Sequence, residues 1–292
     1  MPAVTASGPV TATPSPAALK AASAPTSTNG PSPSVDGLFV ADKATRHSAS
    51  ESFASLAQKD GPLAIKSTGF TDAVIKALGD KKSPAAREGA AEVVIAVSKV
   101  AANALEPFFI ESGLYVALLE SFADKMPAVR TAAVEAVRSF VANTNSWSAA
   151  LLLPALLHEI KTAGKWQVKM GSLAILDQLV VSAPHQTAKL MPDIVPVLSE
   201  AIWDTKADVK KLARESLTKA TALVSNKDIE RFIPALIQSL INPVEEVPKT
   251  IQLLSATTFV SEVDSPTLSL MVPLLSRGLS EKLTATKRKV AV

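Results

Sequence analysis

The chain of 292 residues contains no cysteine, and this absence removes several classes of site. Disulfide bonds, thiolate zinc sites, iron–sulfur clusters and a cysteine nucleophile are all excluded. The first residues also lack the basic segment and continuous apolar run of a secretory signal. The longest strongly apolar run, about Ala149 to Leu157, is too short to cross a bilayer. We therefore expect a cytoplasmic protein without a membrane partner.

Motifs for catalysis and cofactor binding are also lacking. None of the eleven glycines belongs to a Gly-rich loop ending in Gly-Lys-Ser or Gly-Lys-Thr, and there is no Gly-x-Ser-x-Gly elbow. His47, His158 and His185 stand far apart, whereas a metal site needs ligands at defined spacing. We expect surface roles for these histidines, and no catalytic residue, cofactor, metal or small-molecule substrate in this chain.

Aromatic residues make up only 4% of the chain, although 47% of it is hydrophobic. Alanine, leucine and valine supply most of the apolar content, and small or straight-chain apolar residues favour close contact between helices. A β-sandwich needs more aromatic and β-branched residues in alternation. The net charge of +3 is a mild excess that permits an anionic partner such as RNA without demanding one.

A pattern near predicted turns recurs along the chain from Gly69 onward. In five of six places a small or β-branched residue precedes a basic one, and in the remaining place proline replaces the base: Ala86-Arg87, Val129-Arg130, Val168-Lys169, Val209-Lys210, Val247-Pro248 and Thr286-Lys287. The intervals are 43, 39, 41, 38 and 39 residues. A second marker precedes four of these places by 13 or 14 residues, at Pro154, Pro196, Pro234 and Pro273. Two markers with one period indicate a helical repeat array.

Each repeat has the apolar spacing of two amphipathic helices separated by a turn. This predicts an all-α fold, a HEAT-repeat (armadillo-like) α-solenoid of paired antiparallel helices, because an armadillo unit has three helices. No β-strand of four or more residues is expected after Gly69. The second helix of each pair should begin near Ser83, Pro127, Trp166, Ala207, Val247 and Leu283.

The chain divides into three predicted segments. Residues 1–37 contain seven prolines, three glycines and eleven serines or threonines, so they bury too little apolar surface to fold and should be a disordered tail. Residues 38–68 should form an atypical capping unit. Residues 69–292 should be HEAT repeats, the last of them truncated, because the chain ends partway through a second helix. We therefore expect a fragment of a longer protein.

Basic residues near the predicted turns are the candidates for contact with RNA. Trp166 lies between Lys165 and Lys169, and its ring could stack on a base or cover an apolar spot of a partner. The alternative is that it packs inward at the start of a helix. The full candidate set is Lys165, Trp166, Lys169, Lys206, Lys210, Lys211, Lys287, Arg288 and Lys289.

Acidic residues stand six positions before two of the recurrent bases. Asp124 precedes Arg130, and Asp204 precedes Lys210. Such pairs could bridge neighbouring repeats as a ladder that aligns the stack, or the bases could be available to phosphate. We favour the ladder.

Three stretches resemble one family closely. They are Met191–Glu200 with Trp203–Lys206, Asn226–Pro234 and Met271–Leu279. All three are similar to the amino-terminal HEAT domain of fungal translation elongation factor three, and the match extends from about Trp147 to Val292 and more weakly from Leu38. The long Pro/Ser/Thr-rich tail departs from the family and leaves a close paralogue as an alternative.

The resemblance implies that the whole protein is an ATP-binding-cassette ATPase that uses ATP and Mg. It would promote release of deacylated tRNA from the ribosomal exit site during elongation. The HEAT region would dock on the ribosome, contacting ribosomal RNA and ribosomal proteins. A general protein–protein adaptor, such as a translational activator of the kinase-regulating type, is the alternative, and an enzyme is the least favoured interpretation.

Overall fold

The computed structural model describes residues 33–291, and this part of the chain contains helices and no strands. The prediction of an all-α protein is therefore confirmed. The elements are η2 (Val35–Leu38), α1 (Lys43–Ser67), α2 (Phe70–Leu78), α3 (Pro84–Glu111), α4 (Leu114–Ser121), α5 (Pro127–Asn143), η3 (Ser146–Ser148), α6 (Ala149–Thr162), α7 (Trp166–Ser182), α8 (Pro184–Lys189), α9 (Met191–Ala201), α10 (Ala207–Thr221), α11 (Lys227–Glu230), α12 (Ile233–Ile241), α13 (Pro243–Ser255), α14 (Ser265–Ser280) and α15 (Thr284–Ala291).

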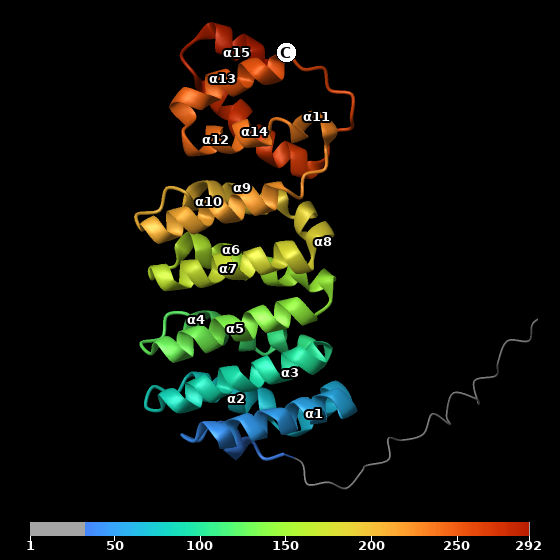
Figure 1. Cartoon of the computed structure of the whole chain (residues 1–292), viewed down its shortest axis with the longest axis vertical. Coiled ribbons are helices and arrows are strands. Elements are labelled where there is room, and N and C mark those ends of the chain that lie inside the picture. The colour runs from blue at the N-terminus through green and yellow to red at the C-terminus, as the bar shows by residue number, and fades with distance from the viewer. Residues whose placement is uncertain (1–32, 292) are drawn as a thin grey trace, which may run out of the picture. The chain divides into compact units, whose positions relative to one another are not determined.

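The helices pair as the sequence period predicts. Each first helix packs on the second helix that follows it, in the order α2–α3, α4–α5, α6–α7, α9–α10, α12–α13 and α14–α15. The second helices α3, α5, α7 and α10 then pack side by side, and α1 packs on α3 in the same way. Figure 1 shows the resulting layers. Because each layer contacts mainly its neighbours, the predicted HEAT-type solenoid is confirmed.

The predicted starts of the second helices agree with the structure at five of six places. Helices α5, α7 and α10 begin at Pro127, Trp166 and Ala207, while α3 and α15 begin one residue after the predicted position. The prediction for α13 was wrong, because this helix begins at Pro243 and not at Val247. Pro243 occupies the first helical position, where a missing N–H costs nothing, and Pro248 removes only a single hydrogen bond inside the helix.

The amino-terminal segments are described only in part. Most of the predicted tail, residues 1–32, lies outside the described residues. Val35–Leu38 form η2, and Leu38 is fully buried. Helix α1 covers most of the predicted capping unit and packs along α3 as a second helix would. Non-helical backbone divides α1 at Gly61 and α3 at Ala101.

Helix α3 is long and apolar enough to cross a bilayer by length and composition alone. Its position accounts for that composition. The helix lies between α1 and α5, and side chains such as Val93, Val94, Val97 and Leu105 are fully buried there. A core helix needs an apolar surface on more than one side, so α3 has the composition expected of the interior of the stack.

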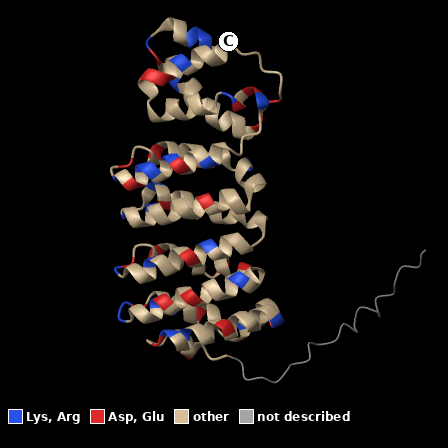
Figure 2. Ribbon diagram, in the orientation of Figure 1, with Lys and Arg blue, Asp and Glu red and all other residues tan. Residues whose placement is uncertain are grey.

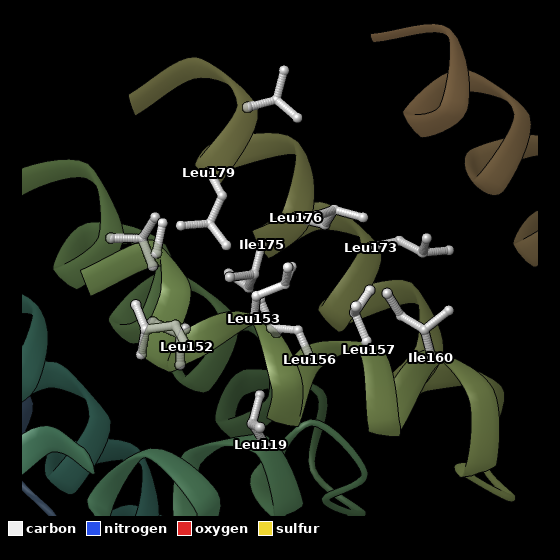
Figure 3. Packing of buried hydrophobic residues seen from close by; sticks show 14 of the residues in the cluster. Leu119, Leu152, Leu153, Leu156, Leu157, Ile160, Leu173, Ile175, Leu176 and Leu179 are labelled. Carbon is white, nitrogen blue, oxygen red and sulfur yellow. The ribbon is translucent and has the colours of Figure 1, made fainter. Parts of the chain in front are cut away.

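The core is a continuous layer of leucine, valine and alanine side chains between first and second helices. In Figure 3, leucines of α6 such as Leu152 and Leu156 lie in one cluster with Ile175 and Leu176 of α7. These four side chains are fully buried. Burying a side chain of this size stabilises a fold by about 1.5–3 kcal/mol, so the stack derives most of its stability from these layers.

One contact between layers leaves no room for a side chain. An ideal Cβ placed on Gly171 of α7 would lie 2.5 Å from Cδ2 of Phe122, whose ring is itself buried. We predict that Gly171→Ala destabilises the chain by about 1–3 kcal/mol, because neither the helix nor the ring can move freely. Urea denaturation followed by circular dichroism measures the change.

Gly164 provides the matched control seven residues earlier. A Cβ at this position meets nothing within 4 Å, and its φ is not positive. Gly164→Ala should leave stability unchanged or raise it by about 0.5 kcal/mol. Equal losses in both variants would contradict the tight contact between Gly171 and Phe122.

Candidate functional site

A basic residue occupies the fourth position of nearly every second helix. The side chain of a residue in the first turn points back toward the helix amino terminus, so a base here reaches the turn region of the stack. The positions are Arg87 in α3, Arg130 in α5, Lys169 in α7, Lys210 in α10 and Lys287 in α15, and Arg46 has the same place in α1. Helix α13 is the exception, with Glu246.

Two of these bases form ion pairs with the turn of the following repeat. The Arg87 guanidinium donates from Nε to Asp124 Oδ2 at 2.7 Å and from Nη2 to Asp124 Oδ1 at 3.1 Å. Lys169 Nζ donates to Asp204 Oδ2 at 2.7 Å. Arg46 reaches acidic residues on the next second helix instead, Glu88 and Glu92. We call each of these cross-repeat pairs a rung.

The ladder is therefore present, but the partners predicted for it were wrong. Asp124 pairs with Arg87 of the preceding repeat and not with Arg130 of its own. Asp204 likewise pairs with Lys169 and not with Lys210. The fourth-position base lies beside the turn of the next layer, because second helices stack side by side, whereas its own turn offers it only backbone carbonyls.

Each turn carboxylate also organises its own turn. Asp124 Oδ1 accepts from the Met126 N–H at 2.8 Å, and Asp204 Oδ1 accepts from the Lys206 N–H at 2.9 Å. Partial burial would raise the pKa of both carboxyls, but hydrogen bonds from the base and from the turn N–H outweigh it. The pKa of each therefore lies below its ordinary value. Both aspartates are held ionised at neutral pH.

The structure brings the predicted residues of two turns to one edge. Lys165 and Lys206 are the residues immediately before α7 and α10, and both side chains are exposed. Trp166 begins α7 and is 42% exposed, so its ring is not packed fully inward. Lys211 is exposed and Lys210 is half-buried in the first turns of α10.

The other predicted residues are differently placed. Lys169 is only 19% exposed, and its charge is already paired with Asp204. It therefore contributes to the ladder. The remaining three, Lys287, Arg288 and Lys289, are exposed on α15 in the last layer, away from α7 (Figure 1). None of these placements tests contact with RNA, which stays a prediction.

Sequence reasoning missed lysines in two earlier turns. Lys81 and Lys82 lie in the turn before α3, and Lys125 lies in the turn before α5, one or two residues further from the second helix than Lys165 and Lys206 are in later repeats. Figure 2 shows Lys and Arg at these turns along one side of the stack. Their position relative to the second helix was the signal that could have identified them. We call Lys81, Lys82, Lys125, Lys165 and Lys206 the basic edge.

The basic edge carries uncompensated charge. Among residues 33–291, none of its five lysines forms an ion pair, and all are exposed. The three histidines are also exposed, as predicted: His47, His158 and His185. The Nε2 atom of His47 lies 3.3 Å from Oε1 of Glu51. No cluster of three or more histidines and acidic residues with metal-binding geometry occurs in the described part of the chain.

Sequence comparison identifies two matching families. The family described as "EF3 N-terminal HEAT repeat" matches residues 46–217, which is more than half of the chain. The family described as "Elongation factor 3/GNC1 HEAT repeat" matches residues 245–292.

Two curated relatives are also elongation factors of this kind. The chain is 53% identical over 258 residues to elongation factor 3 of Mycosarcoma maydis, covering 88% of this chain and 24% of the relative. It is 44% identical over 223 residues to elongation factor 3A of Saccharomyces cerevisiae, covering 76% of this chain and 21% of the relative. The chain thus spans a quarter or less of the length of these relatives.

Among solved structures, a designed armadillo repeat protein is 16% identical, with a TM-score of 0.39 over 88% of this chain and 94% of that chain. A TM-score this low adds nothing to the fold, which the pairing of the helices already establishes.

The Lys169–Asp204 rung predicts a pH-dependent contribution to stability. We expect Asp204→Asn to destabilise the chain by about 1–2 kcal/mol at neutral pH, because it leaves Lys169 without its charged partner. The folded-state pKa of Asp204 is depressed, so the contribution is complete above the unfolded pKa of about 3.9 and disappears as pH falls through the lower folded value. Urea denaturation of both proteins at several pH values measures it.

Glu215→Gln on the same helix is the control. Glu215 is exposed and forms no ion pair among the described residues, so its replacement should change stability by less than about 0.5 kcal/mol at any pH. A loss for Asp204→Asn that persists unchanged in acid would show that the carboxylate charge contributes nothing.

Proposed function

Since this chain belongs to the elongation factor 3 family, within its amino-terminal HEAT-repeat region, we propose that it is a ribosome-binding scaffold whose basic edge contacts ribosomal RNA. Unpaired lysines in successive turns of the stack are the observation that supports the proposal. Adjacent helices pack roughly 10 Å apart, so lysines repeated at that pitch can follow a phosphate backbone. Each phosphate that a lysine neutralises releases counterions, which favours binding at low salt.

The ladder supports this division of roles among the basic residues. Arg87 and Lys169 are bound to carboxylates and hold the layers together. The turn lysines lie outside the rungs, and their flexible side chains can reach a partner without breaking an ion pair. A surface of this kind binds an extended polyanion and requires no deep pocket.

The chemistry of the whole protein is part of the same proposal. It would be an ATP-binding-cassette ATPase that uses ATP and Mg to promote release of deacylated tRNA from the ribosomal exit site, in the cytoplasm. ATP hydrolysis would reside outside residues 1–292, because this sequence has no phosphate-binding loop. Within the protein this region would bind, and catalysis would occur elsewhere.

Charge reversal on the basic edge tests ribosome binding. We expect the double variant Lys165→Glu, Lys206→Glu to pellet less with ribosomes, with a salt dependence of log K reduced by about one unit for each lysine. Its melting temperature should not change, because the Lys206 side chain forms no ion pair or hydrogen bond with residues 33–291 and Lys165 Nζ makes only a 3.3 Å hydrogen bond to the Ala123 carbonyl.

The matched control is Lys59→Glu, Lys99→Glu, which changes net charge equally at exposed positions on α1 and α3. It should retain binding. Unchanged pelleting by the Lys165/Lys206 variant would remove this edge from the docking surface. Binding by the unaltered chain that does not respond to salt would favour an adaptor that uses apolar contacts.

The isolated chain should not bind nucleotide. Calorimetric titration with Mg and ATP at micromolar concentration should give no saturable heat, because no backbone cradle for phosphates is present in the sequence. A protein with a phosphate-binding loop serves as the positive control. A saturable isotherm for this chain would contradict the assignment of ATPase chemistry to the rest of the protein.

A further inference from the structure

Among residues 33–291, the ladder has no rung between α5 and α7. Asp124 and Asp204 stand three residues before the first residues of α5 and α10, Pro127 and Ala207. In α7 the corresponding residue is Ala163, three residues before Trp166. The turn before α7 therefore offers no carboxylate to the base of the preceding repeat, which is Arg130.

The Arg130 guanidinium makes two hydrogen bonds where that of Arg87 makes three, and neither of the two reaches a carboxylate. Arg87 Nη1 donates to the Asp80 carbonyl in its own turn, while Nε and Nη2 reach Asp124. Arg130 Nη1 likewise donates to the carbonyls of Asp124 and Lys125, at 2.8 Å and 3.2 Å. Its Nε and Nη2 form no hydrogen bond with any residue of 33–291. The guanidinium is held in place by one edge, and its other edge is available.

Arg130 lines a groove between α5 and α7. The groove has a volume of about 380 Å³, and its lining includes Arg130, Arg138, Glu135 and Trp166. Lys165 is close by, because its Nζ reaches across to the Ala123 carbonyl beside the preceding turn. Positive groups therefore outnumber the single carboxylate, and an exposed indole surface lies among them.

A half-satisfied guanidinium beside an exposed aromatic ring matches the chemistry of a nucleotide. A guanidinium edge with two N–H groups suits a phosphate, and an indole face suits an unstacked base of any sequence. An acidic peptide would satisfy Arg130 but would leave the ring of Trp166 unused. Double-stranded RNA would present its phosphates with the bases still stacked.

We propose that this groove binds one nucleotide of a single-stranded RNA segment, with the phosphate on Arg130 and the base on Trp166. The inference rests on the proposed function, which supplies RNA as the partner, and it identifies a specific site along the basic edge. Ala163 is the residue that leaves the site open, because an aspartate there would complete the rung.

Introducing the absent rung gives a direct test. The full chain is titrated with a labelled, unstructured single-stranded RNA of about 12 nucleotides at low salt, a length within the range that single-strand-binding modules cover. We expect Ala163→Asp to weaken binding about tenfold, as loss of one charge-assisted contact predicts, without lowering the melting temperature. Trp166→Ala should also weaken binding about tenfold.

Two controls separate charge and stacking from general damage. Ala163→Asn has nearly the shape of the aspartate without its charge and should bind RNA like the unaltered chain. Trp147→Ala removes another exposed ring, 66% accessible and on the short helix η3, and should also have no effect. If Ala163→Asp has a lower melting temperature than the unaltered chain, the variant Arg130→Gln is used in its place. We expect the same loss of RNA affinity from it.

Four results would overturn the site. The first is no RNA binding by the unaltered chain, and the second is unchanged RNA affinity in Ala163→Asp or Trp166→Ala with an unchanged melting temperature. The third is a loss of RNA affinity in Ala163→Asn equal to that in Ala163→Asp. The fourth is tighter binding of an oligoglutamate peptide than of RNA. Ribosome pelleting of the unaltered chain tests the proposed function separately. Pelleting without oligonucleotide binding rejects the groove alone, and oligonucleotide binding without pelleting rejects the ribosome as partner and leaves the groove standing.

Discussion

A carboxylate shared between two repeats is the contact on which the order of this stack depends. Apolar packing between helices is strong but tolerates small displacements, because it has no direction. The aspartate at a turn is different, since Asp124 accepts from the N–H of its own turn and from the guanidinium of the preceding layer. Such a bond forms only in one register of the two helix pairs. Leaving either charge alone and partly buried is costly, so the rung penalises every other register.

The same contact determines which basic residues remain for binding. Bases at the fourth position of a second helix point toward the neighbouring layer, where Arg87 and Lys169 find carboxylates. Lysines four to six positions earlier lie in the turn before the helix and are exposed to solvent. The repeat thus produces an inner row of paired charges and an outer row of unpaired ones, and the two rows differ by about one turn of helix. Net charge alone, at +3, conceals this separation.

The sequence predicted the repeat well because two independent markers recur with one period, and each marks a physical boundary between helices. The prediction failed for α13, because the Val247-Pro248 marker indicated the beginning of this helix, whereas Pro243 occupies its first position. It also misassigned the partners of Asp124 and Asp204. A spacing of six residues within a turn is visible in the sequence, whereas the 37 residues between Arg87 and Asp124 become a contact only when the layers are stacked. The exposure of Trp166 could not be predicted either, because the first residue of a helix can face either side.

Uneven rungs give the array an uneven stiffness. Where Arg87 and Asp124 or Lys169 and Asp204 join two layers, sliding of one layer over the next would break a charged, directional bond. Between α5 and α7 no ion pair of residues 33–291 opposes the same shear, and the two layers are joined by packing such as that of Gly171 with Phe122 and by the Tyr115 hydroxyl, which donates to the Leu152 carbonyl at 3.0 Å. In a solenoid, whose deformation is the sum of small rotations at its joints, bending therefore concentrates at the joint with the lowest resistance. The joint beside Ala163 lacks a rung, so we expect a load applied to the array to change the curvature more there than at the joints that Arg87–Asp124 and Lys169–Asp204 hold.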